Sequence, residues 1–216
     1  MPAEVYLIGI AGPSGAGKTF LARHLKAALD AEVLDLDRYY RDLSHLPLEE
    51  RARMNFDTPE ALEHELLIEQ ATRLRNREAV QLPLYDFTVH TRRAETELLP
   101  PSKVIILEGL FTLHWPGLRD LLSTKVYVDL KDELCFTRRT ERDLRERGRS
   151  EESVAVQYAA TVAPMALRYV RPTFAYADVV VIGNEPIEDG VARVMGHYQS
   201  QVARGKLHLV PHRAKR

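Results

Sequence analysis

The sequence predicts an α/β fold, a doubly wound and mainly parallel sheet with flanking helices, an arginine-rich lid and a small β insertion. Short, continuously apolar runs alternate with stretches of helical periodicity, which is typical of buried parallel strands connected by helices. The first apolar run leads directly into a glycine-rich turn that opens a helix, an arrangement that recurs at the first strand of doubly wound sheets.

The alternation defines the expected elements in order. The expected strands are residues 5–10, 32–36, 104–108, 125–129 and 178–182. The expected helices are residues 18–29, 59–76, 131–146, 151–170 and 187–203. Pro59 suits the first turn of its helix, because the N–H that proline lacks is not needed there. Residues 79–103 interrupt the alternation, and we expect a hairpin-like insertion there with a short strand at Val80-Gln81-Leu82.

Length and composition bound the organisation. We expect one domain at residues 1–203, with the insertion at about 79–103 and a lid at about 138–150, followed by a basic C-terminal tail at 204–216. A net charge of −1 provides no electrostatic case for a nucleic-acid partner. The sequence contains no apolar run of membrane-spanning length and starts without a basic signal segment, so we expect a cytoplasmic protein without a membrane partner. Its single cysteine, Cys135, is expected to be a packed thiol.

The most specific motif is Gly12-Pro13-Ser14-Gly15-Ala16-Gly17-Lys18-Thr19, which fits the phosphate-binding P-loop pattern. Its glycines allow backbone N–H groups to approach phosphate oxygens, and the following helix N-terminus adds partial positive charge. Lys18 is expected to reach the β- and γ-phosphates, and the Thr19 hydroxyl to face Mg²⁺. Pro13 lacks an N–H to donate. The motif predicts a P-loop NTPase-type fold, in either a kinase or a nucleotide-dependent regulator.

Acidic residues follow the carboxyl ends of two expected strands, at the edge of the sheet where ligands bind. Glu108 resembles a Walker B carboxylate that supports Mg²⁺ directly or through water, although an exposed acid or a helix cap would look the same. Asp35 and Asp37 share one face of a strand. One of them could orient Mg²⁺ waters or accept a proton from an attacking hydroxyl, or both could be solvated or cap the next element. We prefer Asp37, which lies further past the strand end.

Six arginines fall within twelve residues: Arg138, Arg139, Arg142, Arg145, Arg147 and Arg149. Mixed with acids on a helix, such a run is usually a solvated face. Gly148 breaks this helix near its end, and planar guanidinium groups suit a transferring phosphoryl group. The functional interpretation is therefore a mobile lid that closes over phosphates.

Aromatic residues follow Pro83 in the irregular segment. Tyr85, Phe87 and His90 could stack on a nucleobase and bind its edge, or they could form an apolar plug that holds the insertion down. Tyr40 leaves the same two interpretations open.

Taken together, these segments resemble the uridine–cytidine kinase family over roughly residues 5–183. The segments that carry the resemblance are the P-loop, Asp37-Arg38-Tyr39-Tyr40-Arg41, Asn55-Phe56-Asp57-Thr58-Pro59-Glu60-Ala61, Pro83-Leu84-Tyr85-Asp86-Phe87, His90-Thr91-Arg92, Leu107-Glu108-Gly109, Arg138-Arg139, Arg142-Asp143, Glu146-Arg147-Gly148-Arg149, Gln157-Tyr158, Pro172-Thr173 and Tyr176-Ala177-Asp178. The Tyr-Asp-Phe-x-x-His and Glu-Arg-Gly-Arg segments are the most specific of them.

The resemblance implies a kinase that transfers the γ-phosphoryl of ATP or GTP to the 5′-hydroxyl of uridine or cytidine. It implies that Asp37 is the catalytic base and that Lys18, Arg139 and Arg147 act on the phosphates. Mg²⁺ would be served by Thr19, Asp37 and Glu108. The implied nucleoside-binding residues are Tyr40, Asp57, Tyr85, Phe87, His90, Arg142, Arg149 and Gln157. The family's usual assembly, a homotetramer, implies a homo-oligomer, and its members are inhibited by CTP and UTP.

Two segments depart from the family's pattern. Phe174-Ala175 stand where a basic pair often precedes Tyr-Ala-Asp, and Ile182-Gly183-Asn184 stand where Pro-Arg-Gly often follows the strand. Two alternatives remain: a related P-loop kinase of ribulose 5-phosphate, pantothenate or nicotinamide riboside, and a non-catalytic ATP-binding regulator. Neither alternative needs Tyr85, Phe87 and His90 together.

Overall fold

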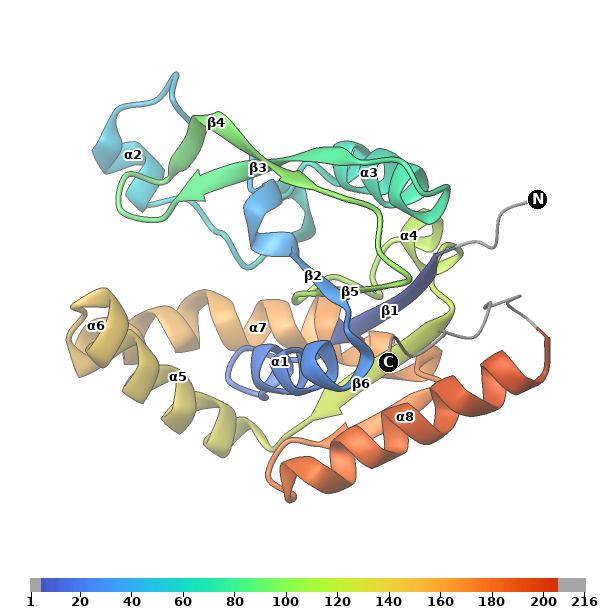
Figure 1. Ribbon diagram of the computed structural model, residues 1–216. Helices are drawn as coiled ribbons and strands as arrows, with labels where there is room; N and C mark the ends of the chain where they lie inside the picture. The colour runs from blue at the N-terminus through green and yellow to red at the C-terminus, as the bar shows by residue number, and fades with distance from the viewer. Residues whose placement is uncertain (1–4, 206–216) are drawn as a thin grey trace.

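The computed structural model describes residues 5–205, which form a five-stranded parallel sheet with helices on both faces (Figure 1). The strand order is β2 (Glu32–Asp35), β5 (Val104–Glu108), β1 (Tyr6–Ala11), β6 (Thr124–Asp129) and β7 (Val179–Ile182). Each expected strand is present to within one residue at either end, and the predicted fold class is confirmed. The chain passes from β1 to β2 and β5 on one side of β1 and then crosses to β6 and β7 on the other side. The order therefore reverses at β1, and doubly wound sheets bind ligands at the carboxyl end of such a strand.

The helices vary widely in length. The α-helices are α1 (Lys18–Leu29), α2 (Leu48–Ala52), α3 (His64–Arg75), α4 (Pro116–Arg119), α5 (Asp132–Arg147), α6 (Glu151–Gln157), α7 (Ala163–Met165) and α8 (Ile187–Ala203). Shorter 3₁₀ turns are η1 (Leu36–Tyr39), η2 (Pro59–Ala61) and η5 (Arg171–Tyr176), and π-helical turns are η3 (Tyr158–Val162) and η4 (Ala166–Val170). The expected helix at 151–170 is therefore a succession of α- and π-helical turns. Of the described helices, none is both long enough and apolar enough to cross a membrane.

The expectation of one helix over residues 59–76 is wrong. Pro59–Ala61 is a single 3₁₀ turn, and the chain is extended at Leu62 before α3 begins. Leu62 forms an antiparallel bridge with Tyr40, and it is almost fully buried. Pairing with a distant segment therefore overrides the helical periodicity of this stretch.

Two hydrophobic cores lie on the two faces of the sheet, and β1 contributes to both. Ile8 and Ile10 point to the core that α1 and α8 cover, which includes Leu25 of α1. Leu7 points to the opposite core, which includes Leu67 of α3. Figure 1 shows α3 and the β3–β4 hairpin on one side of the sheet and α8 on the other. All these side chains are fully buried, as continuous apolar strands predict.

The insertion is a two-stranded antiparallel hairpin of β3 (Val80–Asp86) and β4 (Thr91–Leu99), separate from the main sheet. The expected strand at residues 80–82 is thus too short, and β4 was missed. Most of β4 is exposed and four of its nine residues are charged, so its sequence lacks an apolar alternation that would indicate a strand. Val80, Leu82 and Tyr85 pack into the core on the α3 side and bring the hairpin toward the end of β2.

The expected lid, residues 138–150, consists of the C-terminal part of α5 and the turn into α6. Gly148 adopts a left-handed conformation with φ 61°, and its N–H donates to the carbonyl of Asp143. Ser150 then caps α6 by accepting from the N–H of Ser153. Of the expected basic tail, residues 206–216 lie outside the described part of the chain.

Candidate functional site

The P-loop joins β1 to α1 and packs against α5. Gly15 has φ 84°, and a Cβ there would lie 2.3 Å from the carbonyl oxygen of Cys135, so the position requires glycine. Cys135 itself is fully buried, as expected of a packed thiol. Lys18 begins α1, and its Nζ donates to the carbonyl of Pro13 over 3.0 Å. Burial lowers the pKa of Lys18, against the opposing effect of the Glu108 and Asp37 carboxylates. The ammonium group is therefore held inside the loop, facing carboxylates.

Three carboxylates meet beside Thr19 at the carboxyl edge of the sheet. Asp35 and Glu108 are register partners on neighbouring strands, and Thr19 Oγ1 donates to Glu108 Oε1 over 2.8 Å. Burial, and then the charges of Asp37 and Glu108, raise the pKa of Asp35 to about 8. Burial likewise raises the pKa of Glu108, with Lys18 and Thr19 opposing. Oxygen donors such as these are the ligands that Mg²⁺ prefers, although among the described residues no three acidic, His or Cys side chains are grouped closely enough to hold an ion by themselves.

Asp35 and Asp37 differ in their local contacts. Asp35 Oδ1 accepts the backbone N–H of Asp37 over 2.9 Å, so Asp35 caps the 3₁₀ turn η1 that follows β2. The cap turns the chain at Leu36, and both aspartates remain on the wall of the main cavity described below. The structure thus gives Asp35 a capping contact that the sequence spacing left undecided.

Aromatic rings form a continuous wall that rises from η1 to the hairpin. This aromatic wall consists of Tyr40, Phe56, Tyr85, Phe87 and His90. The ring centroids of Tyr40 and Tyr85 are 5.3 Å apart, and those of Tyr85 and Phe87 are 5.1 Å apart. Phe56 stacks on His90 with 5.2 Å between centroids and 19° between planes. Phe56 was not among the expected site residues, although it follows Asn55 in one of the motifs.

His90 lies at the hairpin turn with φ 50°, which directs the chain back into β4. Burial, followed by the charge of Arg51, lowers the pKa of His90. The imidazole is therefore neutral at physiological pH, with one nitrogen able to donate and the other to accept.

The lid reaches the P-loop through Arg139, which is 6% exposed. Its Nη1 donates to Ser14 Oγ over 2.9 Å, and its Nη2 donates to Gln157 Oε1 over 3.2 Å. The same Nη1 lies 3.9 Å from Asp57 Oδ1. One guanidinium group thus contacts the P-loop, the turn at Asp57 and helix α6. The side chain of Arg147 lies outside what the structure describes.

These groups surround one main cavity of about 1130 Å³. Its lining includes every expected substrate-binding and metal-binding residue, together with Ser14, Lys18 and Arg139; the expected residues are Thr19, Asp37, Tyr40, Asp57, Tyr85, Phe87, His90, Glu108, Arg142, Arg149 and Gln157. Sequence reasoning missed Phe56 and Arg23, which also line it. Residues from seven separate segments of the chain therefore line one partly open cleft together with the P-loop.

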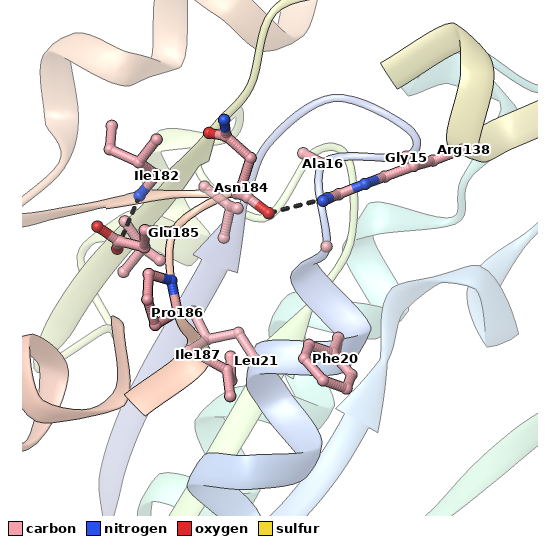
Figure 2. Close-up of a pocket in the computed structure, with 14 residues that line it drawn as sticks. Gly15, Ala16, Phe20, Leu21, Arg138, Ile182, Asn184, Glu185, Pro186 and Ile187 are labelled. Carbon is pink, nitrogen blue, oxygen red and sulfur yellow. Dashed lines mark hydrogen bonds between the residues drawn. The ribbon is translucent and has the colours of Figure 1, made fainter. Parts of the chain in front are cut away.

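A second cavity of about 400 Å³ lies on the other side of the P-loop, and Figure 2 shows its lining. Phe20, Leu21 and Ile187 provide an apolar wall. Arg138 Nη1 donates to the carbonyl of Gly183 over 2.8 Å, which connects α5 to the loop after β7. Residues 182–184, whose sequence departs from the resemblance, form part of this lining. The sequence contained no other signal for the second cavity.

Known proteins of similar sequence include uridine kinases. A uridine kinase from Shewanella amazonensis is 44% identical over 185 residues, 82% of this chain and 87% of the relative. A uridine kinase from Chloroflexus aggregans is 46% identical over 201 residues, 90% of this chain and 96% of the relative. In fold, a phosphoribulokinase from Rhodobacter spheroides superposes with a TM-score of 0.62 at 16% identity, covering 85% of this chain and 74% of that one.

The family model described as "Phosphoribulokinase / Uridine kinase family" matches residues 7–186, a span from β1 to the loop before α8. That span contains the P-loop, the lid, the lining of the main cavity and all of the second cavity's lining except Ile187. The match confirms the resemblance that the motifs indicated. The chain therefore belongs to the phosphoribulokinase/uridine kinase family.

Proposed function

We propose that this kinase transfers the γ-phosphoryl of ATP or GTP to the 5′-hydroxyl of uridine or cytidine. The observation that carries the proposal is the main cavity, where the P-loop and the aromatic wall face one another. A phosphate-binding loop alone is shared by many enzymes, whereas a stacked histidine and three further rings within reach of it suit a flat heteroaromatic acceptor. The uridine kinases at 44% and 46% identity support the same acceptor.

On the donor side, the P-loop N–H groups and Lys18 would hold the phosphates. The second cavity, directly beside Gly15–Gly17, has the position and apolar lining to take the donor's base. Thr19, Asp37 and Glu108 are the proposed Mg²⁺ residues, and their oxygen donors fit that ion. Mg²⁺ supplies charge neutralisation on the phosphoryl oxygens when bound.

On the acceptor side, Tyr40, Tyr85 and Phe87 would pack around the pyrimidine ring. The neutral imidazole of His90 can donate or accept, depending on its tautomer, so it suits both the 4-keto group of uridine and the 4-amino group of cytidine. Asp57 and Arg142 would bind the ribose hydroxyls, and Arg149 and Gln157 would also line the nucleoside side of the cavity.

In the transfer, the bond between the γ-phosphorus and the bridging oxygen of the donor breaks, and a bond to the nucleoside 5′-oxygen forms. Asp37 orients the 5′-hydroxyl and takes its proton late in the reaction. Negative charge spreads over the phosphoryl oxygens, where Lys18, Arg139 and Arg147 would stabilise it. The products are a nucleoside monophosphate and a nucleoside diphosphate.

A product assay tests the proposal. The purified chain is incubated with ATP or GTP and a panel of acceptors: uridine, cytidine, purine nucleosides, nicotinamide riboside, pantothenate and ribulose 5-phosphate. We expect UMP and CMP as the main products. Turnover of another acceptor in preference would favour the related-kinase alternative, and thermal stabilisation by ATP without any acceptor turnover would favour the regulator.

We further propose that the chain acts as a homo-oligomer in the cytoplasm, with small-molecule nucleosides as partners and no nucleic-acid or membrane partner. The homo-oligomer, up to a tetramer, and inhibition by CTP and UTP follow from family resemblance. Light scattering coupled to size-exclusion chromatography measures the oligomeric state. Initial rates with added CTP measure the inhibition. A monomer at assay concentration would count against the proposed assembly.

A further inference from the structure

Among the lid side chains that the structure describes, the carboxylate of Asp143 is the most enclosed charge, with 0% of the side chain exposed. Three guanidinium groups converge on it. Arg142 donates to Oδ1 through Nε over 3.0 Å and through Nη2 over 2.8 Å. Arg139 Nε and Arg149 Nη1 each lie 3.6 Å from Oδ2. All three arginines line the main cavity, whereas Asp143 is not part of its lining.

The local fold explains why these arginines meet. Arg139 precedes Asp143 by one helical turn on the same face of α5. Arg149 follows the end of the helix, and the left-handed Gly148 turns the chain back so that Arg149 returns over the last turn. The backbone N–H of Arg149 then donates to the carbonyl of Asp143 over 3.3 Å. Asp143 therefore links the last turns of α5 to the segment that leads into α6. Figure 1 shows this α5–α6 junction at one end of the molecule.

Guanidinium groups this close repel one another, and a buried carboxylate between them offsets the repulsion and limits where each can point. Arg139 uses its remaining donors on Ser14 and Gln157, and Arg149 uses its own on Gln157 and Ser153. The geometry points to Asp143 as a positioning residue that aims the lid arginines at the acceptor and the phosphoryl group before substrates bind. This inference rests on the proposed function, because it assigns an organiser to the same site.

The test begins with Asp143→Asn, which keeps the side-chain shape and the backbone carbonyl but removes the charge. We expect kcat/KM for uridine to fall by about 10- to 100-fold, since small displacements of aligned groups cost that much. We expect the KM for the donor to change by less than about twofold, because Asp143 is not among the residues that line the second cavity, where the donor's base is proposed to bind. Glu141→Gln, an exposed acid on the same helix, is the matched control and should leave all constants unchanged.

A double-mutant cycle separates positioning from simple support of the helix. If Asp143 acts through Arg149, the loss caused by Asp143→Asn should shrink to about threefold or less in an Arg149→Met background, as expected of coupled residues. The same cycle is run with Arg142→Met and Arg139→Met, and an equal loss in the wild-type background and in all three of these backgrounds would show a merely structural role and overturn the inference.

A second variant, Gly148→Ala, tests the inference independently in case Asp143→Asn does not fold. Gly148→Ala adds a Cβ with nothing within 4 Å, yet it strains the left-handed turn that returns Arg149 to Asp143. We expect a loss of kcat/KM for uridine that disappears in the Arg149→Met background; no loss, or the same loss in both backgrounds, overturns the inference. Wild-type protein inactive on uridine and cytidine would count against the proposed function alone, and the cycle would then use the acceptor that the panel identifies.

Discussion

Thr19 Oγ1 donates a hydrogen bond to Glu108 Oε1 over 2.8 Å, which joins the first turn of α1 to the last residue of β5. The contact places a hydroxyl and a carboxylate from residues 89 positions apart at one point beside the P-loop. Asp35 lies opposite Glu108 in the register of β2 and β5, and Asp37 follows it by two residues. Four oxygen-bearing side chains thus line the main cavity near the P-loop.

The first prediction concerns the metal requirement. Glu108→Gln preserves the shape and the hydrogen bond from Thr19 but removes a negative charge. We expect the free Mg²⁺ concentration for half-maximal turnover to rise by about tenfold, because one carboxylate fewer attracts the ion. Initial rates over a Mg²⁺ series at fixed donor concentration measure this. Glu32→Gln, at the opposite end of β2, is the control, and an unchanged Mg²⁺ requirement in Glu108→Gln would remove Glu108 from the proposed site.

The second prediction separates the two neighbouring aspartates. Asp37→Asn should lower kcat by about 100-fold or more, because the amide cannot accept the 5′-hydroxyl proton, while ATP still binds. Asp35 caps η1 by accepting the backbone N–H of Asp37, and the amide oxygen in Asp35→Asn can still accept that hydrogen bond. We therefore expect Asp35→Asn to lower kcat much less at pH 7. Steady-state kinetics with a donor-binding titration decides this, and near-normal turnover in Asp37→Asn contradicts the assignment.

The third prediction concerns pH. Burial and Arg51 lower the pKa of His90, so the folded protein favours the neutral imidazole. The contribution of His90 to the free energy of unfolding is fully present above the usual pKa of histidine. It is lost as the pH falls through the lowered pKa that His90 has in the folded protein. Uridine affinity should accordingly be constant from about pH 7 upward and weaken in the acidic range as His90 gains a proton. Calorimetric titrations across pH measure this; His90→Gln should lack the acidic weakening, and an identical pH profile in that variant would be evidence against the role.

The fourth prediction concerns the P-loop backbone. Gly15→Ala introduces a methyl group 2.3 Å from the carbonyl of Cys135 at a position with φ 84°. We expect a fall in stability of about 2 kcal/mol or more, together with weakened donor binding, because the loop must move. Gly196→Ala in α8 is the matched control: it meets nothing within 4 Å and should raise stability by roughly 0.5–1 kcal/mol. Thermal melts with and without ATP compare them; equal donor affinity in Gly15→Ala and wild type would contradict the expectation.

Much of the fold and several site residues could be predicted because the signals are local. Continuous apolar runs mark buried parallel strands, and their carboxyl ends must meet at one edge, so Lys18, Asp37 and Glu108 were expected together before any contact was known. The hairpin was harder, because the exposed strand β4 lacks the apolar alternation on which strand prediction depends.

The sequence by itself determined the positions of the main-sheet strands, the phosphate-binding loop and the family, because each is encoded by neighbouring residues. Only the tertiary structure decided that Leu62 pairs with Tyr40 and interrupts a helix, that Phe56 joins the aromatic wall, and that Arg138 reaches Gly183 beside a second cavity. It also gathered three arginines around Asp143. These contacts depend on packing between segments distant in the chain, which local periodicity cannot report.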